Sequence, residues 1–125
     1  MDRRILIVDD EAHLRMLIQQ TLEELEDEGV ELLTASNGEE ALAAIETMKP
    51  NLVFLDVMMP KLSGFDVCQH AKQQLGLKDT YIVLLTAKGQ EFDRMRGLQV
   101  GADLYMTKPF DPDALVQKAR AVLGM

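Results

Sequence analysis

The sequence has a single cysteine, Cys68, which excludes an internal disulfide and leads us to expect a reducing compartment, the cytoplasm. No apolar run approaches the roughly 18 residues of a membrane span, and the four apolar residues after Arg4 are too few for a signal-peptide core. Basic residues are outnumbered, with 13 Lys and Arg against 21 Asp and Glu. Because phosphate backbones attract basic surfaces, this balance argues against direct nucleic-acid binding and favours a cation or a basic partner.

Internal repeats, low-complexity segments and linkers are also missing from the 125 residues. A chain of this length can bury a core of its own, so we expect one domain spanning residues 1–125. Hydrophobic residues make up 47% and charged residues 27%, which is typical of an ordinary globular protein.

Short apolar runs alternate with amphipathic segments along the chain. The runs predict five strands, at residues 4–9, 31–35, 51–56, 81–85 and 103–107. Five helices are expected between and after them, at residues 11–27, 37–48, 63–75, 92–101 and 112–123. Capping residues mark several helix starts, namely Asn37 with Glu40, Ser63 with Asp66, and Asp111 before Pro112. This order predicts an α/β fold, a doubly wound parallel sheet with helices on both faces.

Polar side chains follow the predicted strands at the points where they end. Asp9 and Asp10 come directly after the first strand, Asp56 ends the third, Thr86 follows the fourth and Lys108 the fifth. Sites in open parallel sheets form at the carboxyl ends of strands, so these groups are expected to converge. Carboxylates a few ångströms apart repel one another. The cluster therefore calls for a divalent cation, a cationic side chain or raised pKa values.

These residue types suit phosphoryl transfer to an aspartate. Carboxylate oxygens are ligands that Mg²⁺ prefers, together with waters and a phosphate. The Lys108 ammonium and the Thr86 hydroxyl could each contact a phosphoryl oxygen. A carboxylate nucleophile would form an acyl phosphate, while a metal and a lysine neutralise the transferring group.

With these residues in place, the chain resembles the receiver (CheY-like) domain of two-component response regulators along essentially its whole length. The matching motifs are Ile5–Glu11, Leu55–Pro60, Ser63–Phe65, Leu85–Ala87, and Gly101–Asp103 followed by Tyr105 and Thr107–Phe110. The resemblance implies a five-stranded, flavodoxin-like sheet in the order 2-1-3-4-5.

The resemblance also implies a role for each matching residue. Asp56 would be the phosphoacceptor. Mg²⁺, or Mn²⁺ in its place, would be held by Asp9, Asp10, Asp56 and the backbone carbonyl of Met58. Thr86 and Lys108 would contact the phosphoryl oxygens, and Tyr105 would be an aromatic switch that turns inward when Thr86 moves. The Lys108–Pro109 peptide bond would be cis.

The implied function is signalling, with no enzyme activity beyond the domain's own phosphorylation and dephosphorylation. The phosphoryl donor would be a phosphohistidine on a sensor histidine kinase or a histidine phosphotransfer protein. Phosphorylation would alter the face made by the helix at 92–101, the strand at 103–107 and the last helix. That face would control a downstream protein or output domain, and a phosphorylation-dependent dimer is also implied. Because the sequence ends directly after the last expected helix, both a stand-alone regulator and a receiver from a longer protein stay open.

Three other functions compete with this one. An aspartate-nucleophile phosphatase would keep a second acid two residues after the nucleophile, where this chain has Met58. A nucleotide or flavin binder would cradle phosphate after the first strand, where Asp9–Glu11 would repel it. A pseudo-receiver would keep the fold as an interaction module and never turn over phosphate.

Plainer interpretations exist for single residues. Asp9–Glu11 could cap the first helix, Thr86 could be a turn residue, and Lys108 a solvated surface lysine. Tyr105 could be half-buried core, and Cys68 is expected to be a small buried hydrophobe.

The chain departs from the family at Thr80, where members often have a proline. Met58 and Lys88 lie where members tune the rate of dephosphorylation.

Overall fold

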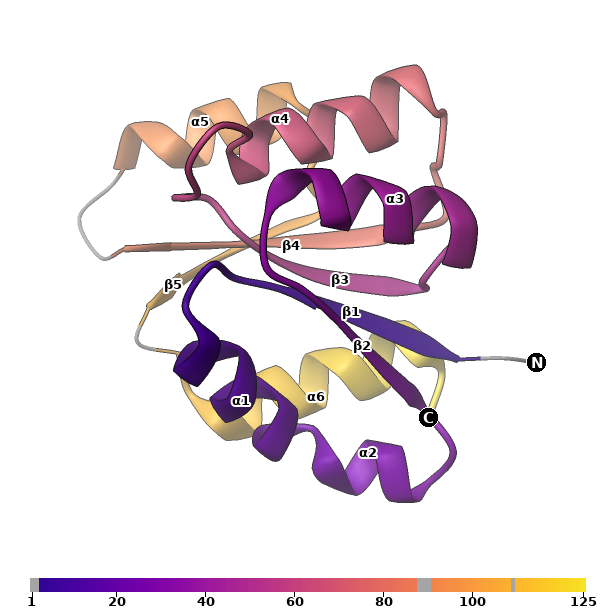
Figure 1. Ribbon diagram of the computed structural model, residues 1–125. Helices are drawn as coiled ribbons and strands as arrows, with labels where there is room; N and C mark the ends of the chain where they lie inside the picture. The colour runs from indigo at the N-terminus through magenta and orange to yellow at the C-terminus, as the bar shows by residue number, and fades with distance from the viewer. Residues whose placement is uncertain (1–2, 88–90, 109) are drawn as a thin grey trace.

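The computed structural model of the chain describes residues 3–87, 91–108 and 110–125. Its centre is one sheet of five parallel strands in the order β2-β1-β3-β4-β5, which confirms the predicted fold class and strand order (Figure 1). The strands are β1 Arg4–Val8, β2 Glu31–Ala35, β3 Leu52–Asp56, β4 Tyr81–Ala87 and β5 Leu104–Lys108.

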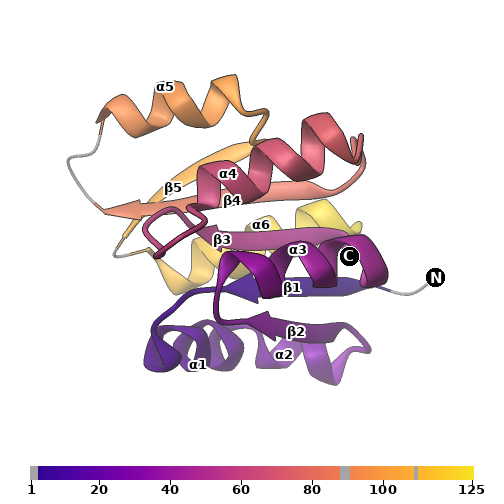
Figure 2. The same ribbon diagram turned by 45° about the horizontal axis from the view of Figure 1, so that its top comes forward.

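Helices cover both faces of this sheet, as a doubly wound fold requires. They are α1 Ala12–Thr21, α2 Glu23–Asp27, α3 Gly38–Met48, α4 Gly64–Gln69, α5 Glu91–Gln99 and α6 Pro112–Leu123. A π-helical turn, η1 His70–Gln74, continues α4. Figures 1 and 2 show α3, α4 and α5 on one face and α1, α2 and α6 on the other.

Alternation along the strands builds two cores, one on each side of the sheet. Successive side chains of a strand point to opposite faces, and in β1 Ile5 and Ile7 join the core under α1 and α6, whereas Leu6 and Val8 join the core under α3 and α4. All four side chains are fully buried. Because β1 is covered on both faces, its sequence is a continuous apolar run rather than an alternating one.

The predicted caps form at three helix starts. The Asn37 side chain accepts a hydrogen bond from the Glu40 amide (2.8 Å), which fixes the start of α3. Ser63 and Asp66 make a reciprocal capping box at the start of α4. The Asp111 side chain accepts from the Asp113 amide just before α6.

The single helix expected at residues 11–27 is wrong, because this segment forms two helices. As a result the described residues contain six α-helices where the sequence predicted five. The break falls at Leu22, whose φ of −96° and ψ of 6° leave the helical region. The Thr21 hydroxyl donates to the carbonyl of Leu17 (2.8 Å), a bond that commonly bends helices. Both Leu22 and Leu25 stay fully buried, so the apolar spacing continues across the break.

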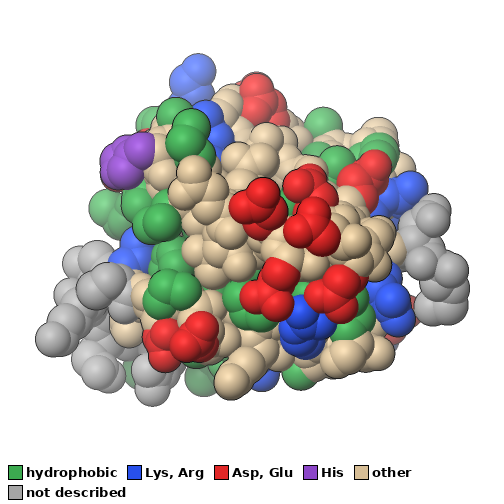
Figure 3. Space-filling model, turned by 90° about the horizontal axis from the view of Figure 1, so that it is seen from below, with side chains coloured by type: hydrophobic (Ala, Val, Ile, Leu, Met, Phe, Trp, Pro, Cys, Tyr) green, Lys and Arg blue, Asp and Glu red, His purple; other side chains and the backbone are tan. Residues whose placement is uncertain are grey.

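The outer surface of α2 is strongly acidic. Its sequence is Glu-Glu-Leu-Glu-Asp, and Figure 3 shows acidic side chains gathered on the side of the molecule that carries α1, α2 and α6. Arg120 of α6 pairs with Glu24 (2.7 Å) and Glu28 (2.6 Å). Within the described residues, no helix combines the length and the apolar character needed to cross a membrane.

Candidate functional site

The predicted functional residues meet at the carboxyl edge of the sheet. Asp9 directly follows β1, Asp56 is the last residue of β3, and Lys108 is the last residue of β5. The parallel register places Asp56 beside Leu85 of β4, one residue before Thr86. Strand order and register therefore bring together side chains that are far apart in the sequence.

Three carboxylates form the acidic part of the site. Asp9 is fully buried and Asp56 is 4% exposed, whereas Asp10 lies open to solvent. One carboxylate oxygen from each of the three residues lies within 4.8 Å of the others. Hard oxygen donors grouped at the rim of a buried edge match the carboxylate-and-water coordination of Mg²⁺. The donor set therefore fits a divalent cation.

Lys108 connects the two buried carboxylates. Its Nζ lies 3.1 Å from Oδ1 of Asp56 and 3.2 Å from Oδ2 of Asp9. Burial disfavours the ammonium form of Lys108, but the carboxylates of Asp56 and Asp9 outweigh burial and raise its pKa above the usual value. A permanent positive charge thus lies at the centre of the edge.

The contact with Lys108 does not offset the effects of burial and of Asp9 on Asp56. Burial first, and then the charge of Asp9, raise the pKa of Asp56 to about 6, although Lys108 and the Met58 amide act in the opposite direction. The sequence predicted that the clustered carboxylates need a divalent cation, a cationic side chain or raised pKa values. The structure has two of these, the cationic side chain of Lys108 and the raised pKa of Asp56. At neutral pH Asp56 is ionised, and additional positive charge would be favourable beside it.

Backbone contacts hold Asp9 in place. Its side-chain Oδ1 accepts from the amide of Glu11 (3.0 Å), and its own amide donates to the Ala35 carbonyl (3.3 Å). The guanidinium of Arg15 donates to the Asp9 carbonyl (2.6 Å). Glu11, the N-cap residue of α1, makes no side-chain cap bond, and the first turn of α1 contains no acid. A capping role accounts for one Asp9 oxygen and leaves the other directed at Lys108.

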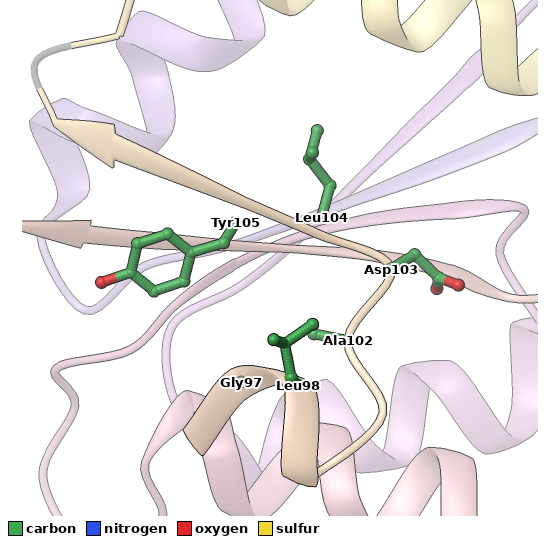
Figure 4. A pocket seen from close by; sticks show the side chains of 6 residues that line it. All are labelled: Gly97, Leu98, Ala102, Asp103, Leu104 and Tyr105. Atoms are coloured by element: carbon green, nitrogen blue, oxygen red, sulfur yellow. The ribbon is translucent and has the colours of Figure 1, made fainter. Parts of the chain in front are cut away.

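Thr86 and Tyr105 lie on the same side of neighbouring strands. Thr86 is 1% exposed, and Tyr105 is half-buried against the core under α3 and α4. The register pairs Thr86 with Thr107, two residues beyond Tyr105, so the two predicted switch residues are diagonal neighbours. In Figure 4 the Tyr105 side chain points away from that of Leu104, toward the side of the sheet that carries α5.

Met58 lies in the loop after β3 and contacts Asp56 through its backbone amide. Its amide donates to Oδ1 of Asp56 (3.3 Å), and its side chain is largely exposed. A thioether cannot transfer a proton, so this position offers no general acid. Of the other positions named from the sequence, Lys88 and Pro109, and with Pro109 the geometry of the Lys108–Pro109 bond, lie outside the described residues.

Sequence reasoning missed two residues that shape the site. Arg15 anchors the Asp9 carbonyl, and a basic residue one turn after Glu11 was the only local signal for it. Gly64 lies directly against the backbone of the phosphoacceptor candidate, because a Cβ added there would meet the Asp56 carbonyl oxygen at 2.4 Å. The Ser-Gly pair at a helix start was visible in the sequence, but it indicated a cap and not this close approach.

Comparison with known proteins gives a consistent picture. A sequence model of the family described as response regulator receiver domain matches residues 5–120. PhoP of Bacillus subtilis, an alkaline phosphatase synthesis transcriptional regulatory protein, is 48% identical over 123 residues, which cover 98% of this chain and 49% of PhoP. PhoB of Pseudomonas aeruginosa, a phosphate regulon transcriptional regulatory protein, is 46% identical over 121 residues, which cover 97% of this chain and 52% of PhoB. The chain spans about half the length of these curated relatives.

A solved structure extends the similarity to the whole fold. The chemotaxis protein CheY4 of Vibrio cholerae superposes with a TM-score of 0.84 at 32% sequence identity. The superposition covers 98% of this chain and 99% of the CheY4 chain. The similarity therefore includes all five strands and the helices on both faces of the sheet.

Proposed function

Because this chain belongs to the response regulator receiver domain family of two-component signal transduction, we propose that Asp56 is its phosphoacceptor. The donor is a phosphohistidine on a sensor histidine kinase or a histidine phosphotransfer protein, and residues 1–125 act as one receiver domain. The observation that carries this proposal is the contact of the buried Asp56 carboxylate with Lys108, beside the carboxylates of Asp9 and Asp10.

In the proposed reaction a carboxylate oxygen of Asp56 attacks the phosphorus atom of the phosphohistidine. A P–O bond forms while the P–N bond breaks, and the electron pair of that bond stays with the imidazole nitrogen. Asp56 is ionised above about pH 6 and is therefore nucleophilic at neutral pH. Lys108 then donates its hydrogen bond to a phosphoryl oxygen in place of Asp56, and the Thr86 hydroxyl moves to contact a second phosphoryl oxygen.

The metal in this proposal is Mg²⁺, with Mn²⁺ as a substitute. The grouped carboxylates of Asp9, Asp10 and Asp56 would hold it, together with the backbone carbonyl of Met58. When bound, the cation neutralises charge on the phosphoryl group. The carboxylate of Asp9 supports this assignment, because after burial it is the second cause of the raised pKa of Asp56, and a nearby cation would offset it.

Phosphorylation adds about 1.5 to 2 negative charges to the buried edge of the sheet. Thr86 and Tyr105 transmit this change to the face formed by α5, β5 and α6, which then favours a different partner.

A hollow of about 300 Å³ lies on this face beside Leu98 and Tyr105 (Figure 4). Met95 and Leu98 are 67% and 72% exposed there, so the face offers apolar surface to an output domain, a downstream protein or a second phosphorylated copy.

Turnover of external phosphate esters is not part of the proposal. The position two residues after Asp56 is Met58, which has no proton to transfer. The domain's own chemistry is limited to accepting the phosphoryl group and to its later hydrolysis. A cytoplasmic location completes the proposal, because a single cysteine, Cys68, cannot form an internal disulfide and suits a reducing compartment.

The test is incubation with acetyl phosphate and Mg²⁺, followed by intact-mass measurement. We expect the mass of one phosphoryl group on the wild-type chain, its loss on treatment with hydroxylamine, and no adduct on Asp56→Asn. Asp66→Asn, which changes a capping acid of α4 instead, serves as the control and should still accept the group. An adduct that survives Asp56→Asn would assign the phosphoacceptor elsewhere.

A further inference from the structure

The loop at residues 57–63, which joins β3 to α4, carries Met58 and therefore one proposed ligand of the metal. The two ends of this loop are in direct backbone contact. The Gly64 amide donates to the Val57 carbonyl (3.0 Å), and a Cβ on Gly64 would lie 2.4 Å from the Asp56 carbonyl oxygen. The base of the loop is thus closed, and only glycine fits there.

The far side of the loop is in equally close contact with α3. Gly38, the first residue of α3, is buried, and a Cβ built on it would lie 2.5 Å from the Cβ of Leu62 and 3.0 Å from the Leu62 carbonyl oxygen. The backbone conformation of Gly38 does not require glycine, since its φ is not among the positive ones. Close approach to Leu62, with Val67 Cγ2 a looser neighbour at 3.2 Å, is therefore the reason that the structure gives for glycine at this position.

The segment between these two contacts is strained and has space beside it. Lys61 has a φ of 68°, in the left-handed region that residues with a Cβ seldom adopt. Such a conformation persists only where the surroundings impose it. A hollow of about 200 Å³ separates the start of α3 from Pro60 and Lys61, so tight packing does not extend along this side. The contact between Gly38 and Leu62 therefore restrains this end of the loop, whereas the buried side chains of Val57 and Met59 restrain its start.

We propose that Gly38 and Leu62 are positioning residues that set the place of the Met58 carbonyl in the metal site. This inference rests on the proposed function, since it takes that carbonyl as a ligand. Mg²⁺ requires near-ideal octahedral geometry with ligands at about 2.0–2.1 Å, so a loop displaced by a few tenths of an ångström loses affinity. The two residues act on the metal through the loop and do not touch it.

The first test is Gly38→Ala, with Mg²⁺ affinity of the unphosphorylated protein measured by isothermal titration calorimetry. The added methyl group must displace Leu62, and we expect Mg²⁺ to bind about tenfold more weakly, as for changes in residues that orient metal ligands. Gly97→Ala is the matched control, because Gly97 is also a buried helical glycine, and its Cβ would meet Leu84 Cδ1 at 3.1 Å. We expect this control to lower the urea midpoint without changing Mg²⁺ affinity.

The second test separates the Leu62 Cβ from the rest of its side chain. Leu62→Ala keeps the Cβ that faces Gly38, so Mg²⁺ affinity should stay close to that of the wild type. Leu62→Gly removes the Cβ and should weaken binding. The double variant Gly38→Ala/Leu62→Gly should bind Mg²⁺ no more weakly than Leu62→Gly alone, because the two changes act through one contact and are not additive.

The outcomes are distinct from those that bear on the proposed function. Wild-type affinity in both Gly38→Ala and Leu62→Gly would overturn the inference, as would equal losses in Leu62→Ala and Leu62→Gly. If Gly38→Ala does not fold, the comparison of Leu62→Gly with Leu62→Ala decides. A wild-type chain that neither binds Mg²⁺ nor accepts a phosphoryl group from acetyl phosphate would instead contradict the proposed function itself.

Discussion

The ammonium group of Lys108 lies 3.1 Å from the carboxylate of Asp56, although 51 residues separate them in the sequence. The same ammonium lies 3.2 Å from the buried carboxylate of Asp9. One cation therefore lies between two anions. The site keeps an excess of negative charge, which favours the binding of a further cation.

Lys108→Met should destabilise the metal-free protein at neutral pH. The change leaves Asp9 and Asp56 without their shared cation, and we expect the free energy of unfolding to fall by about 2 kcal/mol. Urea denaturation in EDTA at pH 7.5 measures this loss, and added Mg²⁺ should restore part of it. Lys108→Arg, which keeps the charge, is the control. Equal stability of Lys108→Met and wild type in EDTA would mean that the ion pairs contribute nothing.

Asp56→Asn should stabilise the metal-free protein at pH 8. The pKa of Asp56 is about 6 in the folded state and about 3.9 in an unfolded chain. Because the folded state binds this proton more tightly, the charged carboxylate lowers stability above pH 6, and that penalty disappears as the pH falls through 6 toward 4. We expect Asp56→Asn to gain about 2–3 kcal/mol at pH 8 and progressively less at lower pH.

Urea denaturation in EDTA across this pH range measures the Asp56→Asn effect. The control is Asp27→Asn, which changes an exposed acid of α2 and should show no such pH dependence. A gain for Asp56→Asn that is the same at pH 8 and pH 4 would show that the raised pKa does not operate in the protein.

Asp10→Asn should weaken Mg²⁺ binding and leave the fold intact. Asp10 is exposed, so its side chain contributes little to the core, yet one of its oxygens lies within 4.8 Å of those of Asp9 and Asp56. Calorimetric titration with Mg²⁺ should show at least about tenfold weaker binding, with an unchanged urea midpoint in EDTA. A clear loss of stability would instead identify the acids after β1 as structural caps of α1.

Most of the fold and the location of the site follow from local sequence patterns. The apolar run Ile5–Val8 predicts a strand buried on both faces, and parallel pairing then brings its carboxyl end to those of β3 and β5. Asp9, Asp56 and Lys108 could therefore be predicted to meet. The caps of α3, α4 and α6 were equally readable, because a cap depends on residues only two or three positions apart.

Features set by contacts between distant residues could not be predicted in this way. The break at Leu22 does not interrupt the apolar spacing, since Ile18, Leu22 and Leu25 all stay buried. The packing of Gly38 on Leu62 joins the start of α3 to the loop between β3 and α4, with no local signature of the contact. The raised pKa of Asp56 likewise depends on burial and on Asp9, which only the assembled sheet supplies.

The η1 turn is a further example, and it leads to a prediction about stability. Lys72, within η1, pairs with Asp103 just before β5 (2.8 Å), and its ammonium also donates to the Thr80 carbonyl. Its side chain is only 10% exposed. Asp103 Oδ2 accepts from the Ile82 amide as well (2.8 Å), so one ion pair connects η1, the start of β4 and the start of β5.

Lys72→Met keeps most of the apolar stem of the side chain but removes the cation. Removing one partner leaves a carboxylate and a carbonyl with less than their full set of donors, and we expect a loss of about 2–3 kcal/mol in the free energy of unfolding. Lys78→Met is the control, since Lys78 is exposed and enters the network only through its carbonyl. Arg120→Met provides a contrast, because the acids that Arg120 pairs with lie open to solvent, and screened pairs of this kind contribute little. We therefore expect a large shift of the urea midpoint for Lys72→Met and a small one for Arg120→Met, and the reverse order would show that the Lys72 pair is not a main connection between η1 and the sheet.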